Sequence, residues 1–290
     1  MFTITQYQVT LSILKPIIFN TYPGFYLRNA LINAMVDYCQ NPNRIKNNKV
    51  THCQGCRFLD KCAYASLNLP VLEPVGTPAI MPFMLDVTDL IVGKYQQGEI
   101  IFGFRLLGNA DKYASLFADS FDAIGKQYGI GENGQPGSFS LREMRKINVI
   151  HAGEILAAQP SQAESLGLSF RQLKLSDKMM DTLQAIPFSL LIQFSNSRIS
   201  EIGSTYGAGP ADNPALIIPP GLDNMVAHTA QMAKCNYQYA GSRQGYWFFN
   251  GMLQYSGNLS AYYNLLRLAS YTGIGGFTSY GFGTFSLHNE

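Results

Sequence analysis

The stretch Gly273-Ile274-Gly275-Gly276-Phe277-Thr278-Ser279-Tyr280-Gly281-Phe282-Gly283, near the C-terminus, decides how the rest of the chain is interpreted. One apolar residue lies inside each of two glycine pairs, Gly273/Gly275 and Gly281/Gly283, and Gly276 directly follows the first pair. Glycine adopts backbone angles that are closed to other residues and lets a second backbone approach closely. The pattern predicts a surface loop whose glycine amides and Ser279 bind phosphate groups; the alternative is a β-hairpin in which the glycines only permit the turn.

The spacing also resembles the C-terminal glycine-rich signature of the RAMP superfamily, and within it the CRISPR repeat-processing endoribonucleases, the family numbered six among the Cas proteins. In that family the loop follows a helix close to the C-terminus, as it does here. Many relatives carry a lysine or arginine directly after the first glycine pair. This chain has Gly276 there, which removes one side-chain contact to phosphate. The resemblance implies an α+β fold of two tandem ferredoxin-like (RRM/RAMP) domains with a C-terminal glycine-rich loop.

The composition is that of a folded, mildly basic protein. A length of 290 residues allows one large domain or two smaller ones, and 47% apolar residues supply a full core, which excludes a disordered chain. A net charge of +2 and a pI near 8.2 predict a local RNA contact rather than a broad basic surface. The chain shows neither a secretory signal nor an apolar run of about 18 residues, so we expect a cytoplasmic protein without membrane contact.

The first half of the chain carries the pattern of one ferredoxin-like unit. Residues 2–14 alternate between apolar and polar positions and predict a strand, and Leu27, Leu31, Ala34, Met35 and Tyr38 mark one face of a helix. A strand over 100–108, a helix over 111–125 and a strand over 139–149 follow. A strand, a helix and further strands in this order predict a βαββαβ domain over residues 1–165.

The second half predicts a similar domain over residues 166–290. We expect an interdomain region over 152–178, an apolar strand over 186–194, a long loop over 203–220 and a helix over 222–235. A hairpin over 236–255 precedes a helix that Asn258 caps, and the glycine-rich stretch closes the domain as a second hairpin.

The cysteines point to a metal site. Cys53 and Cys56 have the spacing of a knuckle that lets two thiolates reach one tetrahedral ion, and Cys62 and Cys39 complete a four-sulfur set. Such a set predicts a structural zinc ion; the alternative is unligated cysteines packed as small hydrophobic residues. One branch of the resembled family carries a helix of small residues followed by a similar cysteine cluster.

Two polar segments are candidate RNA contacts. Arg44 and Lys46 lie in a basic loop, which is either a solvated connection or an RNA-facing one. Ser242-Arg243-Gln244 resembles a segment that contacts RNA in the family, and an arginine can form paired hydrogen bonds with a phosphate or a guanine edge. The alternative for this segment is an ordinary polar hairpin tip.

The resemblance implies a reaction as well as a fold. It implies metal-independent cleavage of the repeat hairpin of precursor CRISPR RNA by the ribose 2′-OH, with a general base, a general acid and a cation that stabilises the phosphorane. His52 is the first candidate for the proton transfers, and Arg28 and Tyr26 are candidates for charge stabilisation and orientation. His228 is the second candidate, whereas His151 and His288 are expected to be structural or solvated.

A second function is open at this stage. Paired ferredoxin-like RAMP proteins also serve as non-catalytic subunits that bind CRISPR RNA and build an effector complex with other Cas subunits. A zinc-ribbon binding protein would explain the cysteines but not the C-terminal glycines. The endoribonuclease and the non-catalytic subunit share the precursor CRISPR RNA as partner, and neither needs a catalytic cofactor. They differ in whether the RNA is cut.

Overall fold

The computed structural model describes residues 1–46, 49–50, 53, 55–58, 61–68, 81–132, 136–162, 164–176, 179, 186–207, 222, 225–238 and 245–289. They form two compact units that do not follow the chain in simple halves. The N-terminal unit comprises Gln6–Leu106 and Ala110–Asn148. The C-terminal unit comprises Met1–Thr5, Leu107–Asn109 and Val149–Glu290.

The N-terminal unit is built on a four-stranded sheet with two helices. Its elements in chain order are β1 (Thr3–Lys15), α1 (Pro23–Met35), β5 (Phe83–Asp86), β7 (Glu99–Leu107), α3 (Ala114–Ala123) and β8 (Ser138–His151). The strand order β5-β7-β1-β8 places the first strand of the βαββαβ unit between the third and the fourth. This is the ferredoxin-like arrangement that the sequence predicts.

Smaller elements decorate this unit. They are β2 (Ile17–Phe19), which pairs with β6 (Gly93–Tyr95), β3 (Ile45–Lys46), which pairs with β4 (Lys49–Val50), and α2 (Ala63–Asn68). The pairing of β3 with β4 places the backbones of Arg44 and Lys46 at a small hairpin. Among the described residues, no helix is long and apolar enough to cross a membrane.

Aromatic side chains hold α3 of this unit against its sheet. The ring centre of Phe117 on α3 lies 4.9 Å from that of Phe104 on β7 and 5.4 Å from that of Phe83 on β5. One turn further along α3, the ring centre of Phe121 lies 5.7 Å from that of Phe102. The i, i+4 spacing of Phe117 and Phe121 explains why one helix face covers two strands.

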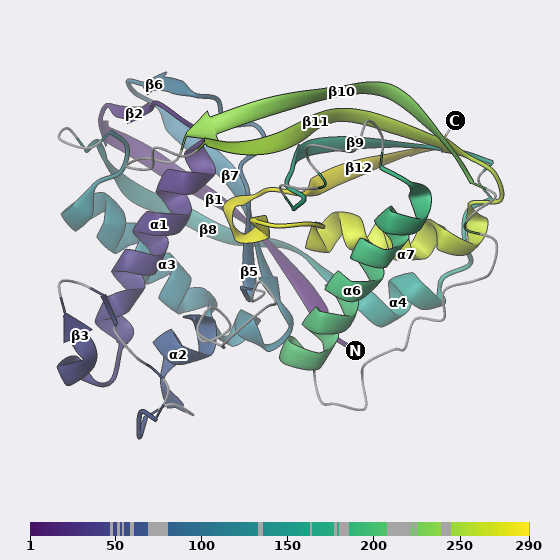
Figure 1. The fold of residues 1–290 in the computed structure, drawn as a ribbon. Coiled ribbons are helices and arrows are strands. Elements are labelled where there is room, and N and C mark those ends of the chain that lie inside the picture. Colours follow the sequence, from purple (N-terminus) through teal and green to yellow (C-terminus); the bar gives the residue numbers. More distant parts are fainter. Residues whose placement is uncertain are drawn as a thin grey trace. The chain divides into compact units, whose positions relative to one another are not determined.

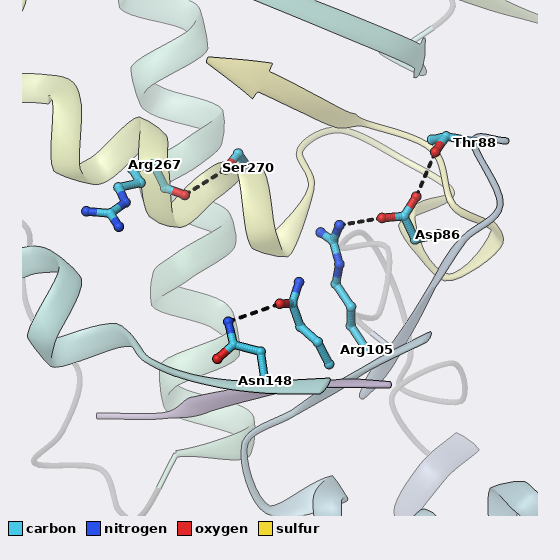
Figure 2. A network of polar contacts seen from close by, with 7 residues as sticks. Asp86, Thr88, Arg105, Asn148, Arg267 and Ser270 are labelled. Carbon is cyan, nitrogen blue, oxygen red and sulfur yellow. Dashed lines mark hydrogen bonds and ion pairs between the residues drawn. The ribbon is translucent and has the colours of Figure 1, made fainter. Parts of the chain in front are cut away.

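A polar contact ties β5 to β7 within the same unit. Arg105 Nη2 donates to Asp86 Oδ2 at 2.5 Å, and the Thr88 hydroxyl donates to Asp86 Oδ1 at 3.0 Å (Figure 2). Both oxygens of the Asp86 carboxylate therefore have a donor. A half-buried carboxylate satisfied in this way stabilises the pairing of two neighbouring strands.

The C-terminal unit repeats the same topology. Its elements are α4 (Ala152–Ala157), β9 (Ser165–Leu173), α6 (Phe188–Tyr206), β10 (Val226–Gln238), β11 (Gly245–Ser256), α7 (Ser260–Thr272) and β12 (Thr284–Asn289). The strand order is β10-β11-β9-β12, again with the first strand of the βαββαβ set between the third and the fourth. Both helices α6 and α7 lie against one face of this sheet (Figure 1). The protein is thus an α+β protein with tandem ferredoxin-like domains.

The segment over 186–194 is not the strand predicted from the sequence. From Phe188 onward it forms the start of α6, whose buried residues Leu191, Ile192, Ser195, Ile199 and Ile202 recur with helical spacing. The apolar run looks continuous over its first residues, and only its continuation to residue 206 shows the period of a helix. The predicted loop over 203–220 therefore begins inside a helix, and residues 208–221 lie outside the described part.

The helix predicted over 222–235 is also wrong. Val226 to Gln238 form β10, which pairs antiparallel with β11 along a long hairpin from Val226 opposite Ser256 to Gln238 opposite Gly245. Alanine, methionine and lysine in this segment favour a helix locally, but the cross-strand hydrogen bonds of the hairpin outweigh that preference. His228 consequently lies on a strand and not on a helix.

Three smaller expectations for this unit are also corrected. The segment over 152–178 contains α4 and β9, and β9 lies between β11 and β12 inside the sheet. The N-cap of α7 is Leu259 rather than Asn258. The glycine-rich stretch connects α7 to β12, and because β12 pairs with β9, the stretch is a crossover loop and not a hairpin.

Candidate functional site

The glycine-rich loop begins where α7 ends. Gly273, the C-cap of α7, has φ 65°, and Gly275, Gly281 and Gly283 have φ of 75°, 94° and 74°. All four lie in the left-handed region that glycine alone occupies without strain. The G-x-G pattern in the sequence therefore marks four backbone positions that the path of the loop requires to be glycine.

Two of these glycines also allow close contact with other backbone. A Cβ on Gly275 would overlap the carbonyl oxygen of Lys174, and a Cβ on Gly283 would overlap that of Ile274. Gly276 differs, because a Cβ there would meet its nearest neighbour, Lys174 Cγ, at 3.5 Å. The loop is packed too tightly for side chains at Gly275 and Gly283 but not at Gly276.

Backbone hydrogen bonds close the loop onto β9 and onto itself. Gly276 N donates to Lys174 O at 2.8 Å, Gly283 N donates to Gln172 O at 3.1 Å, and Ile274 N donates to Gly283 O at 3.0 Å. The amides of Tyr280, Gly281 and Phe282 donate within the loop. Most amides expected to bind phosphate are thus used inside the protein. Any contact with a ligand must come from the exposed surface around Gly275 and from nearby side chains.

Aromatic rings flank the loop. The rings of Phe248 on β11 and Phe282 are stacked with centres 4.3 Å apart, and the ring centres of Tyr246 and Phe277 are 5.1 Å apart. Phe277 is one of two non-glycine residues with positive φ among those described, at 63°. Such strain in a bulky residue persists only where the surroundings impose it. The half-buried Tyr246, Phe277 and Tyr280 offer ring surface beside the glycines.

Ser279, which the sequence predicts to bind phosphate, is buried in the loop. It is 6% exposed in the short 3₁₀ turn Thr278–Tyr280, so its side chain points into the protein. Gly273 is also buried, whereas Gly275 is exposed and Gly276 is half-buried. The structure therefore offers the exposed Gly275 and the half-buried Gly276 to a ligand, rather than Ser279 or Gly273.

The candidate catalytic residues Tyr26 and Arg28 lie on α1 of the N-terminal unit, both half-buried. The ring of Tyr26 lies 5.4 Å from that of Phe19, centre to centre. Arg28 lies near Tyr64, where burial raises the pKa of the phenol and the positive charge of Arg28 opposes that rise. Residues two apart on a helix point in nearly opposite directions, so Tyr26 and Arg28 do not face each other.

The four clustered cysteines lie near one another on the same unit. Asn41 links two of them: Cys39 Sγ donates to Asn41 O at 3.7 Å, and Asn41 Nδ2 donates to Cys56 Sγ at 3.7 Å. Burial raises the pKa of the Cys39 thiol, and the neighbouring Cys62 and Cys56 raise it further. Cys53 and Cys62 are buried.

This cluster is not a closed metal site as it stands. Within the part of the chain that the structure describes, no group of three or more histidine, cysteine, aspartate or glutamate side chains is arranged to hold a metal ion. The zinc ion predicted for Cys39, Cys53, Cys56 and Cys62 therefore stays a prediction.

Several predicted residues lie outside the described part. His52 and the segment Ser242-Arg243-Gln244 are among them, and the side chains of Arg44, Lys46 and His228 are not described. His151 is exposed at the end of β8, and His288 Nε2 lies 3.1 Å from Ser169 Oγ and 3.0 Å from Ser286 Oγ.

Sequence reasoning missed Arg198, a buried arginine on α6. Its guanidinium donates to the Thr272 carbonyl and the Thr278 hydroxyl, at the two ends of the first part of the loop. The signal was present, because Ser195, Arg198, Ile199 and Ile202 share one helical face. The interpretation of residues 186–194 as a strand concealed it.

Paired ferredoxin-like domains with a glycine-rich loop between the last helix and the last strand define a RAMP-type protein. Comparison with protein families agrees: residues 167–285 match the model described as CRISPR-associated endoribonuclease Cas6, and residues 2–166 match AF_1859_N, described as an N-terminal domain. The C-terminal part of the chain therefore carries the domain of the CRISPR-associated endoribonuclease Cas6 family. A comparison with curated proteins finds no match.

Solved structures show the same fold over nearly the whole chain. A Cas6 product complex has a TM-score of 0.55 at 16% identity and covers 99% of this chain and 100% of its own. Thermus thermophilus Cas6 has a TM-score of 0.51 at 12% identity, with 99% of each chain covered. A RAMP protein described as binding different RNA substrates has a TM-score of 0.50 at 11% identity, covering 98% and 100%. At these identities the likeness establishes the fold.

Proposed function

We propose that the protein binds the repeat hairpin of precursor CRISPR RNA in the cytoplasm and cleaves it at the base of the hairpin. The observation that carries this proposal is the glycine-rich loop within the region that matches the Cas6 family, residues 167–285. Its glycines have the backbone angles and close packing that make it a fixed platform, and Tyr246, Phe277 and Tyr280 border it with aromatic surface for stacking on unpaired bases.

The proposed chemistry is attack by the ribose 2′-OH on the adjacent phosphate. The O–P bond to the 5′ oxygen breaks as the 2′ oxygen bonds to phosphorus, leaving a 2′,3′-cyclic phosphate and a 5′-OH. A general base removes the 2′-OH proton, and a general acid protonates the leaving oxygen. His52 is the candidate for proton transfer, Arg28 for stabilisation of the phosphorane charge and Tyr26 for orientation of the substrate. This reaction needs no metal ion.

The test is incubation of the purified protein with a labelled repeat RNA from its own locus in EDTA. The same RNA with a 2′-deoxy substitution at the cut site is the substrate control. Cleavage of the unmodified RNA alone supports 2′-OH attack, and His52→Ala and Arg28→Ala should then lower the single-turnover rate by about 100-fold or more. His151→Ala, at an exposed histidine on β8, should leave the rate unchanged. Cleavage that needs added Mg²⁺ would contradict the mechanism.

A second function remains, because one of the structural neighbours is described only as a RAMP protein that binds different RNA substrates. In this case the protein would hold CRISPR RNA and scaffold an effector complex with other Cas subunits without cutting. Tight binding of the repeat hairpin with no product from either RNA would favour it. The two functions are compatible, since a processing enzyme that stays on its product also enters such a complex.

A further inference from the structure

Arg198 lies behind the glycine-rich loop of the C-terminal unit. It is 7% exposed, and its guanidinium makes two hydrogen bonds to the loop. Nε donates to the Thr272 carbonyl at 3.2 Å, and Nη2 donates to the Thr278 hydroxyl at 2.9 Å. Thr272 is the last residue of α7, and Thr278 opens the 3₁₀ turn. One rigid side chain thus joins the two ends of the segment that contains Gly273, Gly275 and Gly276.

The charge of this side chain is unusual for so buried a position. Burial lowers the pKa of Arg198 to about 10, which leaves it positively charged at neutral pH. Glu201 and the phenol of Tyr206 act on it electrostatically, but among the described residues no carboxylate lies within ion-pair distance of the guanidinium. Its hydrogen bonds go to neutral acceptors, and both acceptors belong to the ends of the loop.

Ordinary packing does not explain this choice of residue. A buried arginine without an ion pair is unfavourable compared with an apolar side chain of similar volume. What the guanidinium provides is a planar set of donors with fixed directions, which a lysine or methionine lacks. The two bonds fix residues 272 and 278 relative to α6, and the exposed Gly275 lies between them.

We propose that Arg198 is a positioning residue for RNA binding: it holds Gly275 and Gly276 of the loop in the geometry that the repeat RNA recognises. It acts through Thr272 and Thr278 and does not touch the RNA. The inference rests on the proposed function, because the proposed function is what assigns RNA binding to the loop. Hydrogen exchange of the loop is measurable without RNA, so the two proposals can be tested separately.

The variants are chosen to separate geometry from charge and from stability. Arg198→Lys keeps the charge and loses the two-point geometry, and Arg198→Met loses both. Thr278→Val removes one acceptor, while Thr278→Ser keeps the hydroxyl and serves as its matched control. Arg267→Met is the control for arginine removal, because Arg267 is exposed on α7 and its carbonyl accepts from the Ser270 hydroxyl at 2.8 Å (Figure 2).

Two measurements are made on each variant. Hydrogen exchange of the amides of residues 274–283 is followed without RNA, and binding of a labelled repeat RNA is measured by fluorescence anisotropy. We expect Arg198→Lys and Arg198→Met to accelerate loop exchange at least 10-fold and to weaken RNA binding at least 10-fold. Thr278→Val should show a smaller change of the same kind, and Thr278→Ser and Arg267→Met should match the unmodified protein.

The outcomes distinguish the proposals. The positioning role is overturned if Arg198→Lys leaves loop exchange and RNA affinity unchanged. A lower melting temperature of that variant does not rescue the proposal when loop exchange and RNA affinity stay the same. If Arg198→Met does not fold, the difference between Thr278→Val and Thr278→Ser decides. If the unmodified protein binds no repeat RNA, the proposed function fails, and faster loop exchange in Arg198→Lys would then establish only that Arg198 holds the loop.

Discussion

At the scale of single residues, the glycines of the loop are not equivalent, and this leads to a first prediction. Gly283→Ala and Gly275→Ala place a Cβ against a carbonyl oxygen at positive φ, whereas Gly276 has neither restriction. We expect the first two substitutions to lower the free energy of unfolding by about 2–4 kcal/mol and Gly276→Ala by less than about 1 kcal/mol. Urea denaturation measures both. Equal effects at all three positions would show that the loop adapts and is not a fixed platform.

A second prediction at this scale concerns the stability of the Arg198→Met variant. Burial lowers the pKa of Arg198 well below its ordinary value, to about 10, which corresponds to about 3 kcal/mol of unfavourable burial. Removing the charge relieves this term but leaves the Thr272 carbonyl and Thr278 hydroxyl without a donor, at about 1–3 kcal/mol each. The terms nearly cancel, so we expect the free energy of unfolding to change by less than about 3 kcal/mol.

The direction of the Arg198 pKa shift determines how the stability difference between the unmodified protein and Arg198→Met depends on pH. A base whose pKa is lowered on folding destabilises the folded state while it is charged. This effect disappears only as the pH rises above about 10, towards the ordinary pKa of arginine. Arg198 therefore makes no contribution to pH dependence between pH 7 and pH 9. Urea titrations of the unmodified protein and Arg198→Met at these two pH values should give the same difference in free energy. A difference that varies by more than about 1 kcal/mol would mean that a neighbouring group titrates with it.

At the scale of secondary-structure elements, the reliability of the sequence pattern depends on where the stabilising contacts lie. Strand β1 and helices α1, α3 and α7 follow from local alternation or helical spacing, which their own residues carry. β10 does not, because its pairing with β11 is a contact between segments that local propensity does not record. The glycine-rich loop was found because backbone geometry leaves a mark in the sequence. Arg198 was hidden because the interpretation of residues 186–194 as a strand concealed the helical spacing of α6.

The cysteine-rich segment gives a prediction about metal removal. The Cys53–Cys56 turn is closed by a Cys56 N to Cys53 O hydrogen bond of 3.0 Å, and Gly55 has φ 69°. We expect the purified protein to contain about one equivalent of zinc, since four thiolates suit a tetrahedral structural site. A strong chelator should remove the ion and lower the melting temperature. Atomic emission spectrometry gives the metal content.

The chain provides a matched control for this experiment. Cys235 lies on β10, far from the other four cysteines in the sequence, and like them it forms no disulfide. Cys53→Ser and Cys56→Ser should abolish zinc binding, and Cys235→Ser should leave it unchanged. Less than about a tenth of an equivalent of zinc in the protein as purified would mean that the cysteines are packed as small hydrophobic residues.

At the scale of the whole molecule, the two compact units do not follow the chain in simple halves. Met1–Thr5 and Leu107–Asn109 belong to the C-terminal unit, although both lie in the first half of the chain. The Ala152 amide donates to the Phe2 carbonyl at 3.1 Å, and Asn264 Nδ2 on α7 donates to the Ala158 carbonyl at 2.6 Å. These bonds join segments far apart in the chain, which a pattern read in short windows does not detect. The predicted boundary between the two domains, at residues 165/166, stays a proposal.

This interleaving leads to a prediction that crosses the two halves of the sequence. Gly108 has φ 55°, and a Cβ there would overlap the carbonyl of Tyr206, the last residue of α6. Gly108→Ala should therefore loosen the end of a helix that lies about 100 residues away in the chain, at a cost of about 2 kcal/mol or more. Because Arg198 is on α6, hydrogen exchange should accelerate over residues 199–206 and also in the glycine-rich loop. Gly98→Ala is the control, since Gly98 has φ 93° but no atom within 4 Å of its Cβ position, so it carries the backbone strain without the overlap. If both variants leave α6 exchange unchanged, the segment at 107–109 does not support the C-terminal unit.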